Sequence, residues 1–169
     1  MVKKTTPRSF RHIWSVLCRF ASIDKESTSL SLLNVIEEIT LKKIEGEENV
    51  TEDPDAGKKA FVVPIEFAIV TFLERLDGGD WLAMTKEAQI KIVDPSANTL
   101  LESGFSINFP QGPKRMRHVL KMNGLKITTA GTYRFYISMR ESKEDSFELV
   151  AEIPVDVKGN ALQNQQGLS

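Results

Sequence analysis

The side chains that most often carry catalysis are scarce in this sequence. Its 169 residues include two histidines, His12 and His118, and a single cysteine, Cys18. A nucleophilic mechanism needs a serine or cysteine beside a base, and no pattern here places such a pair together. His118 and Cys18 each fall within an apolar stretch. We therefore expect a hydrogen-bonded structural histidine, an inert core thiol, no catalytic residues and no enzymatic activity.

Carboxylates gather in residues 45–60, where a proline and a glycine also occur. One interpretation is a long, solvated and flexible loop. The other is a cation-binding loop, because clustered carboxylates supply the oxygen ligands that calcium prefers. The spacing does not match a known calcium loop, and the sequence has no zinc-type cluster, phosphate-binding loop or dinucleotide turn. We favour the solvated loop and predict neither a metal nor a cofactor.

Positive charge is concentrated locally, although the formal net charge is −1. Residues 110–128 contain lysines and arginines and no acid. If the apolar residues of 115–122 and 132–140 face a core, the alternating polar residues face outward. Strands that follow each other in sequence are neighbours about two times in three. The predicted face for binding an anionic polymer consists of Arg115, Arg117, Lys121, Arg134, Tyr136 and Arg140. The alternative is a solvated sheet face, balanced by acids such as Glu148 and Glu152.

The elements that hold these side chains are predicted from the spacing of apolar residues. Positions 132–139 and 147–157 alternate strictly, with Phe147 and Leu149 in the apolar phase of the second run. This pattern predicts an antiparallel hairpin at the centre of a sheet. Residues 12–21 fit helical and strand spacing equally, and we interpret them as a strand because the next residues form a turn into a second run.

Two irregularities interrupt the strand patterns. Within 30–44 the apolar phase changes, which indicates a bulge or a strand that is buried first on both faces and then on one. Pro64 lies inside the strand-like run 61–76 and cannot donate to a ladder. It therefore predicts an edge, a bulge or a break at that point.

About eight strands separated by turn signals predict an all-β fold, a single antiparallel β-sandwich with immunoglobulin-like or related Greek-key topology. Gly131 and Tyr133 open a late strand, and in such sandwiches the tyrosine hydroxyl can bond to upstream backbone. We expect a domain over 10–158, a flexible basic segment over 1–9 and a disordered tail over 159–169. No apolar run approaches the roughly 20 residues of a membrane span. The lone cysteine favours a cytoplasmic location.

Two stretches of the sequence resemble small uncharacterised bacterial all-β proteins. The first is Ser29-Leu30-Ser31-Leu32-Leu33-Asn34-Val35-Ile36-Glu37-Glu38-Ile39, which follows Asp24 in a turn. The second is Gly131-Thr132-Tyr133-Arg134-Phe135-Tyr136-Ile137. The resemblance spans most of the chain and implies a β-sandwich of unknown function, with no functional residues to carry over. The acidic segment 45–60 is a departure from that pattern.

The function predicted from these observations is that of a non-enzymatic protein-binding or assembly module. Open sheet edges suit the binding of a protein partner, and that partner can be a second copy of the chain. The alternative function is the binding of nucleic acid or another anionic polymer by the basic strand face. Neither function involves a membrane.

Overall fold

The computed structural model describes residues 8–24, 26–41, 50–52, 59–78 and 82–159. All its regular elements are strands, ten rather than about eight. They are β1 Phe10–Ile23, β2 Leu30–Val35, β3 Glu38–Thr40, β4 Val50–Glu52, β5 Lys59–Arg75, β6 Met84–Val93, β7 Thr99–Phe109, β8 Arg115–Ile127, β9 Gly131–Arg140 and β10 Glu148–Lys158.

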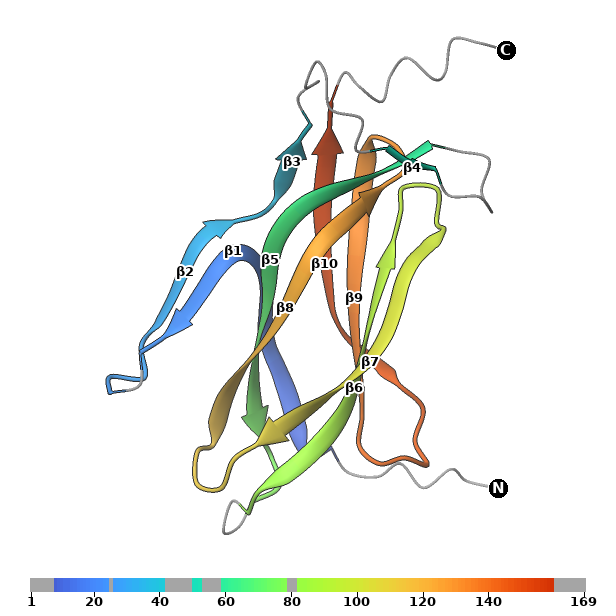
Figure 1. Cartoon of the computed structure of the whole chain (residues 1–169). Helices are drawn as coiled ribbons and strands as arrows, with labels where there is room; N and C mark the ends of the chain where they lie inside the picture. Colours follow the sequence, from blue (N-terminus) through green and yellow to red (C-terminus); the bar gives the residue numbers. More distant parts are fainter. Residues whose placement is uncertain (1–7, 25, 42–49, 53–58, 79–81, 160–169) are drawn as a thin grey trace.

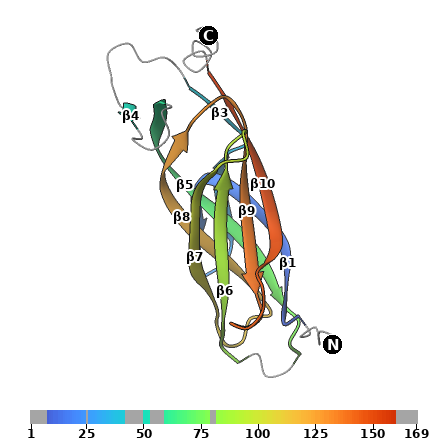
Figure 2. The same cartoon turned by 90° about the vertical axis from the view of Figure 1, so that its right-hand side faces the viewer.

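The strands form two curled sheets, which confirms an all-β, sandwich-like fold (Figures 1 and 2). The β5 sheet has the order β2-β1-β5-β4, and β8 also pairs with β5. The β9 sheet has the order β3-β10-β9-β6-β7. The pairs are antiparallel except for β3 with β10, which are parallel.

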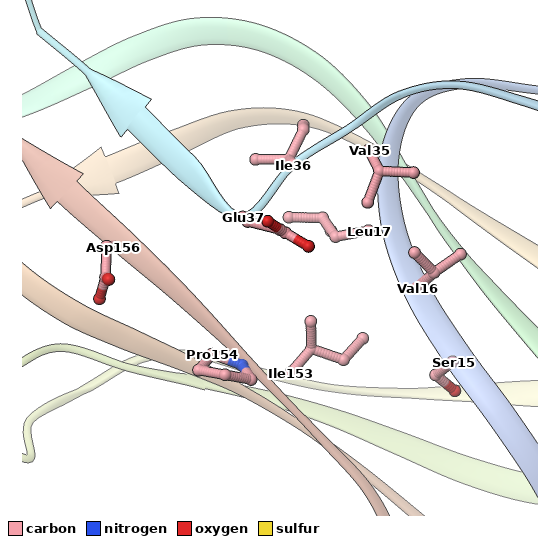
Figure 3. Close-up of a pocket in the computed structure, with 9 residues that line it drawn as sticks. All are labelled: Ser15, Val16, Leu17, Val35, Ile36, Glu37, Ile153, Pro154 and Asp156. Atoms are coloured by element: carbon pink, nitrogen blue, oxygen red, sulfur yellow. The ribbon is translucent and has the colours of Figure 1, made fainter.

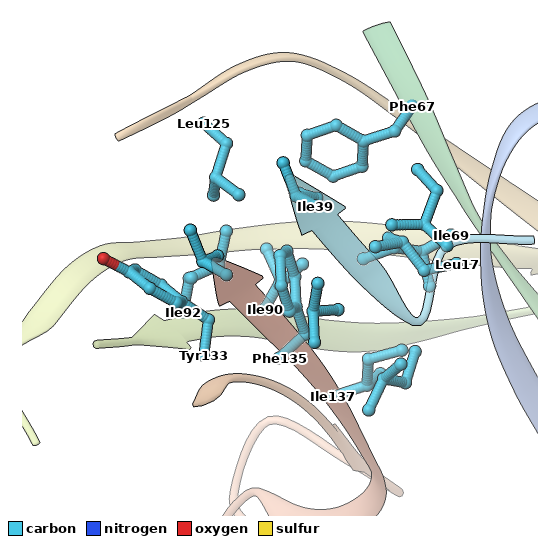
Figure 4. Packing of buried hydrophobic residues seen from close by; sticks show 14 of the residues in the cluster. Leu17, Ile39, Phe67, Ile69, Ile90, Ile92, Leu125, Tyr133, Phe135 and Ile137 are labelled. Atoms are coloured by element: carbon cyan, nitrogen blue, oxygen red, sulfur yellow. The ribbon is translucent and has the colours of Figure 1, made fainter. Parts of the chain in front are cut away.

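The core lies between the two sheets and is built from the alternating apolar residues that the sequence pattern predicts (Figure 4). Phe67 of β5 meets Phe135 of β9 edge to face, with ring centroids 5.9 Å apart. Leu17 and Ile69 of the β5 sheet pack in the same cluster as Ile137. Burying each large apolar side chain contributes about 1.5–3 kcal/mol, so this cluster fixes how the sheets face each other.

The predicted hairpin of the last third is confirmed as β9 and β10, with one correction. The pairing of the two strands shifts between Leu149 and Ala151, so the alternation reverses there. Leu149 is 57% exposed and Phe147 is 37% exposed, and both were expected to face the core. The guanidinium carbon of Arg140 lies 4.7 Å from the centroid of the Phe147 ring.

The strand interpretation of residues 12–21 is also confirmed, and the phase change after residue 30 has a different cause from the one expected. The chain leaves the β5 sheet after β2 and joins the β9 sheet as β3. At this crossing the Ile36 amide donates to the Leu17 carbonyl (2.8 Å), and the Asp156 amide donates to the Glu37 carbonyl (2.9 Å). The first half of the run therefore packs on a small cluster of Cys18, Ala68 and Val70, whereas Ile39 of the second half lies in the main core.

Two local features match their predictions. The pairing of β5 with β8 shifts between Val63 and Glu66, so Pro64 lies at a bulge. The Tyr133 hydroxyl accepts from the Thr128 amide (2.8 Å) and donates to the Thr129 carbonyl (2.9 Å). This tie fixes the turn that leads into β9.

Several predictions concern residues that the structure describes only in part. Of the acidic segment 45–60, residues 45–49 and 53–58 lie outside the described residues, as do 1–7 and 160–169. In the ranges that are described, no group of three metal-ligating side chains lies close enough to hold an ion. No helix in the same ranges is long and apolar enough to cross a membrane.

Candidate functional site

The residues of the predicted basic face lie on two different sheets. Arg115, Arg117 and Lys121 are on β8, which pairs with β5. Arg134, Tyr136 and Arg140 are on β9, which pairs with β6 and β10. The expected adjacency of β8 and β9 is therefore wrong, because the turn between them carries the chain from one sheet to the other.

Most of these cations already have partners nearby. Arg134 bonds to Glu152 (Nε to Oε1, 2.9 Å), and Arg140 pairs with Glu87. On β8, the Arg115 Nε lies 3.2 Å from an oxygen of the buried Glu74. Burial raises the pKa of Glu74, but hydrogen bonds from Lys114 and Arg11 outweigh burial and hold that pKa below its ordinary value. These contacts match the alternative of a solvated, charge-balanced surface.

His118 faces inward as expected, but its ring nitrogen lacks the expected bond. The ring stacks on Phe105 of β7, with centroids 5.3 Å apart. The Nε2 atom has no hydrogen-bond partner among the described residues, and burial lowers the pKa of His118. A neutral, stacked imidazole of this kind has a packing role.

The structure brings together one pair that the sequence did not indicate, His12 and Ser15. The His12 Nε2 lies 2.9 Å from the Ser15 Oγ, which lies 3.0 Å from the Thr71 Oγ1. Residues three apart on a regular strand face opposite sides, and the register shift between His12 and Trp14 removes that separation. Burial lowers the pKa of His12, outweighing a backbone bond at Trp14 that raises it. No ion pair of the described residues joins a carboxylate to His12, whereas a serine hydrolase holds its histidine with one.

A projecting hairpin holds several of the exposed large apolar side chains of the described surface. We call it the arm, and it consists of Cys18–Ile23 of β1 together with β2 (Figure 1). Asp24 shapes its turn: the Oδ1 atom accepts from the Glu26 amide (3.1 Å) and from the Ser27 amide (2.6 Å). The bond from the Ser27 amide is the main reason that the pKa of Asp24 is lowered.

The arm is fixed at its tip, at its base and along one face. At the tip, the Arg117 Nη1 donates to the Thr28 carbonyl (3.1 Å). At the base, the Ile36 amide bonds to Leu17, as described above. Along the face, Leu30 and Leu32 pack on a small cluster of Cys18, Ala68 and Val70. Cys18 is fully buried and burial raises the pKa of its thiol, which confirms the predicted core cysteine.

The arm also exposes a stripe of large apolar side chains. Phe20 is 53% exposed, Leu33 is 58% exposed and Val35 is 50% exposed. Phe20 and Leu33 lie directly opposite each other in the pairing of β1 with β2. We call these residues the stripe. Because the arm is fixed underneath, the stripe is held outward rather than free to fold onto the core.

The outer edge of β2 is unpaired and carries no charge. β2 pairs with β1 on one side and with no other described strand. Its sequence is Leu-Ser-Leu-Leu-Asn-Val, and it is the one described strand whose span contains neither a charged residue nor a proline. Natural proteins usually protect edge strands with lysine, proline or other charges, because an open edge is a template for pairing.

A hollow of about 370 Å³ adjoins the base of the arm (Figure 3). It lies between β1, β10 and the segment that crosses from β2 to β3, and Val35 belongs to both the stripe and the hollow. Leu17, Ile36 and Ile153 give it an apolar lining, and the Glu37 carboxylate points toward it. Val35 therefore joins the stripe to the hollow, whose lining also includes the polar residues Ser15 and Asp156.

A second hollow, of about 920 Å³, lies between the start of β1 and the β9–β10 turn. Its lining is mixed in charge, and its charged groups pair with each other or with neighbours. Arg8 pairs with Glu148, and Lys86 lies 2.7 Å from Glu141. The polar groups of this hollow are thus already occupied.

Comparisons with known proteins add little to this geometry. No family model matches the chain, and no curated protein matches it. Among solved structures, the chain is similar to a β-glucuronidase from glycoside hydrolase family 2, at 14% identity and a TM-score of 0.40. The matched part covers 64% of this chain, and the chain spans 12% of that enzyme's length. A likeness this low carries no argument, and the resemblance to bacterial all-β proteins stays a prediction.

Proposed function

We propose that this chain is a non-enzymatic protein-binding or assembly module and that it binds through the arm. A partner segment in an extended conformation would add a strand to the outer edge of β2. Main-chain hydrogen bonds would then provide affinity, and side-chain contacts with the stripe would provide specificity.

The main support for this proposal is the uncharged open edge of β2, which lies beside the stripe. An exposed, apolar edge strand is a hazard for aggregation, so its presence on a rigid arm needs a reason. Pairing with a partner removes the hazard by covering the edge. A side chain of the added strand would also contact Leu33, which is 58% exposed.

The hollow at the base of the arm extends the proposed binding surface. Binding energy at protein interfaces concentrates where a side chain fills an apolar pocket. Leu17, Ile36 and Ile153 line such a pocket directly beside Val35 of the stripe. A partner segment that runs along β2 would place one of its side chains there.

We also propose immunoglobulin-like connectivity for the two sheets. β1, β5 and β8 lie in one sheet, while β6, β9 and β10 lie in the other. The bonds from the Tyr133 hydroxyl to the turn before β9 are a recurrent feature of such sandwiches. We also propose a cytoplasmic location, because the sequence has a single cysteine and its free thiol is buried.

The proposal is tested by comparative affinity capture from the native cell. The full chain is compared with a Leu33→Lys variant, which puts a charge into the stripe. Ser106→Lys, at the exposed open edge of β7, is the matched control. We expect the wild-type chain and the control to recover the same proteins, including further copies of the chain, and Leu33→Lys to lose them. Recovery that is independent of Leu33 would contradict binding through the arm.

A further inference from the structure

We propose that the partner of the β2 edge is a second copy of this chain. Two β2 strands would pair antiparallel about a two-fold axis and join two β5 sheets into one continuous sheet. This inference rests on the proposed function, because it names the partner of the same edge. Its test below can fail while binding of another protein through the arm stands.

Charge self-complementarity is the reason to choose a second copy. In a two-fold contact each strand meets its own sequence, so any charge at the centre meets an identical charge. β2 contains no charged residue, so it meets itself without repulsion. The other long open edges differ: β7 carries Glu102, β8 carries Arg115 and Lys121, and the part of β10 that β3 leaves open carries Glu152 and Pro154.

The geometry of the arm fits a pairing centred on Leu33. In antiparallel pairing, directly opposite residues point to the same face of the sheet. A register that places Leu33 opposite Leu33 of the second copy therefore brings the two stripes together. Phe20, which is opposite Leu33 within one chain, then lies one strand away from the two-fold axis. The contact would pair both open edges and bring the two Leu33 side chains against each other.

The arm is already organised for this contact. Its tip is tied to β8 by Arg117, and its inner face is packed on Cys18 and Val70. Little conformational freedom remains to be lost when the second copy pairs, and such preorganisation favours association. The contact is nevertheless small, because β2 has 6 residues. We therefore expect a dimer that dissociates on dilution.

Sedimentation velocity of the full chain over a range of concentrations tests the inference. We expect a monomer–dimer equilibrium for the wild-type chain. Leu33→Lys and Leu33→Glu should each weaken it by about ten-fold or more, because like charges would face each other at the two-fold axis. The control Ser106→Lys should dimerise like the wild type.

Mixing the two variants distinguishes charge repulsion from a folding defect as the cause of any lost dimerisation. A Leu33→Lys chain and a Leu33→Glu chain place opposite charges at the axis, so an equimolar mixture should dimerise where neither variant does alone. A wild-type chain that is monomeric at every concentration, or a mixture that stays monomeric, would overturn the inference. Loss of the dimer in Ser106→Lys would overturn it as well. In each case, Leu33-dependent capture of a different protein would leave the proposed function intact.

Discussion

The arm and the β9–β10 hairpin both place an exposed leucine beside an open strand edge, but they protect that edge differently. Leu33 on the arm is 58% exposed and Leu149 on β10 is 57% exposed. The open part of β10 contains Glu152, and it contains Pro154, which has no amide to donate. β2 has no such feature. Exposed apolar area alone therefore does not distinguish the two edges; the backbone and charge chemistry beside it does.

The two hairpins also differ in what they contribute to the molecule. β9 supplies fully buried side chains to the main core, including Tyr133 and Phe135. The arm covers only the small cluster around Cys18 and holds the stripe outward. We infer that β9–β10 determines stability and that the arm determines association. The four predictions below test this division, in order of decreasing expected effect.

The largest difference in stability is expected between alanine substitutions of two phenylalanines, one in the core and one on the arm. Phe135→Ala should lower the free energy of unfolding by about 3–5 kcal/mol, because it leaves a cavity against Phe67. Phe20→Ala on the arm should change it by no more than about 0.5 kcal/mol, because that ring is half exposed. Urea denaturation of both variants measures the two values. Equal losses of unfolding free energy in the two variants would contradict the inference that β9–β10, and not the arm, determines stability.

A smaller loss of stability is expected when one hydroxyl group at the start of β9 is removed. Tyr133→Phe keeps the ring but removes the hydroxyl that bonds to Thr128 and Thr129. Partly buried backbone groups would lose their partner, so the free energy of unfolding should fall by about 1–3 kcal/mol. Thermal unfolding monitored by circular dichroism provides the measurement. The outcome that would contradict it is an unchanged melting temperature.

Acid should loosen the tip of the arm. The pKa of Asp24 in the folded chain is lowered below its ordinary value of 3.8, chiefly by the Ser27 amide. Its contribution to stability is therefore present above 3.8 and is lost as the pH falls through the lowered value. Amide exchange at Ser27 should accelerate over that interval. Asp24→Ala should show fast exchange at every pH, and slow exchange in that variant would mean that Asp24 does not hold the turn.

No effect is expected from removing the serine–histidine contact of the described residues. Ser15→Ala abolishes the bond to His12, and hydrolysis of p-nitrophenyl acetate should be as slow with this variant as with the wild-type chain. A wild-type rate clearly above that of Ser15→Ala would contradict the proposal that the protein is not an enzyme. His12→Gln would then show whether the histidine acts as the base.

Much of the fold could be predicted from alternation, because a period of two reports which side chains face a core. That signal located β9 and β5, and the missing amide of Pro64 separately indicated the irregularity that the structure shows as a bulge. It does not report which sheet a strand joins. The transfer of the chain between Val35 and Glu38, and the separation of Arg117 from Arg134, depend on long-range pairing.

Less of the candidate site could be predicted. The sequence places Leu33 and Val35 in an apolar phase, as a buried strand would, and only the structure shows that this phase faces outward. The contact of His12 with Ser15 depends on a register shift that leaves no mark in the composition. One sequence signal for the site does exist: the span Leu30–Val35 contains no charge and no proline.

The parallel pairing of β3 with β10 has a mechanical consequence. Glu38 lies opposite Asp156 and Thr40 lies opposite Lys158, so the chain enters the pair at one end and leaves it at the other. A pulling force applied before β3 and after β10 would act along the two strands in opposite directions. The hydrogen bonds between them would be loaded together in shear, instead of opening one after another as in an unzipping hairpin. The last contacts of the β9 sheet would thus act as a clamp when the chain is under tension.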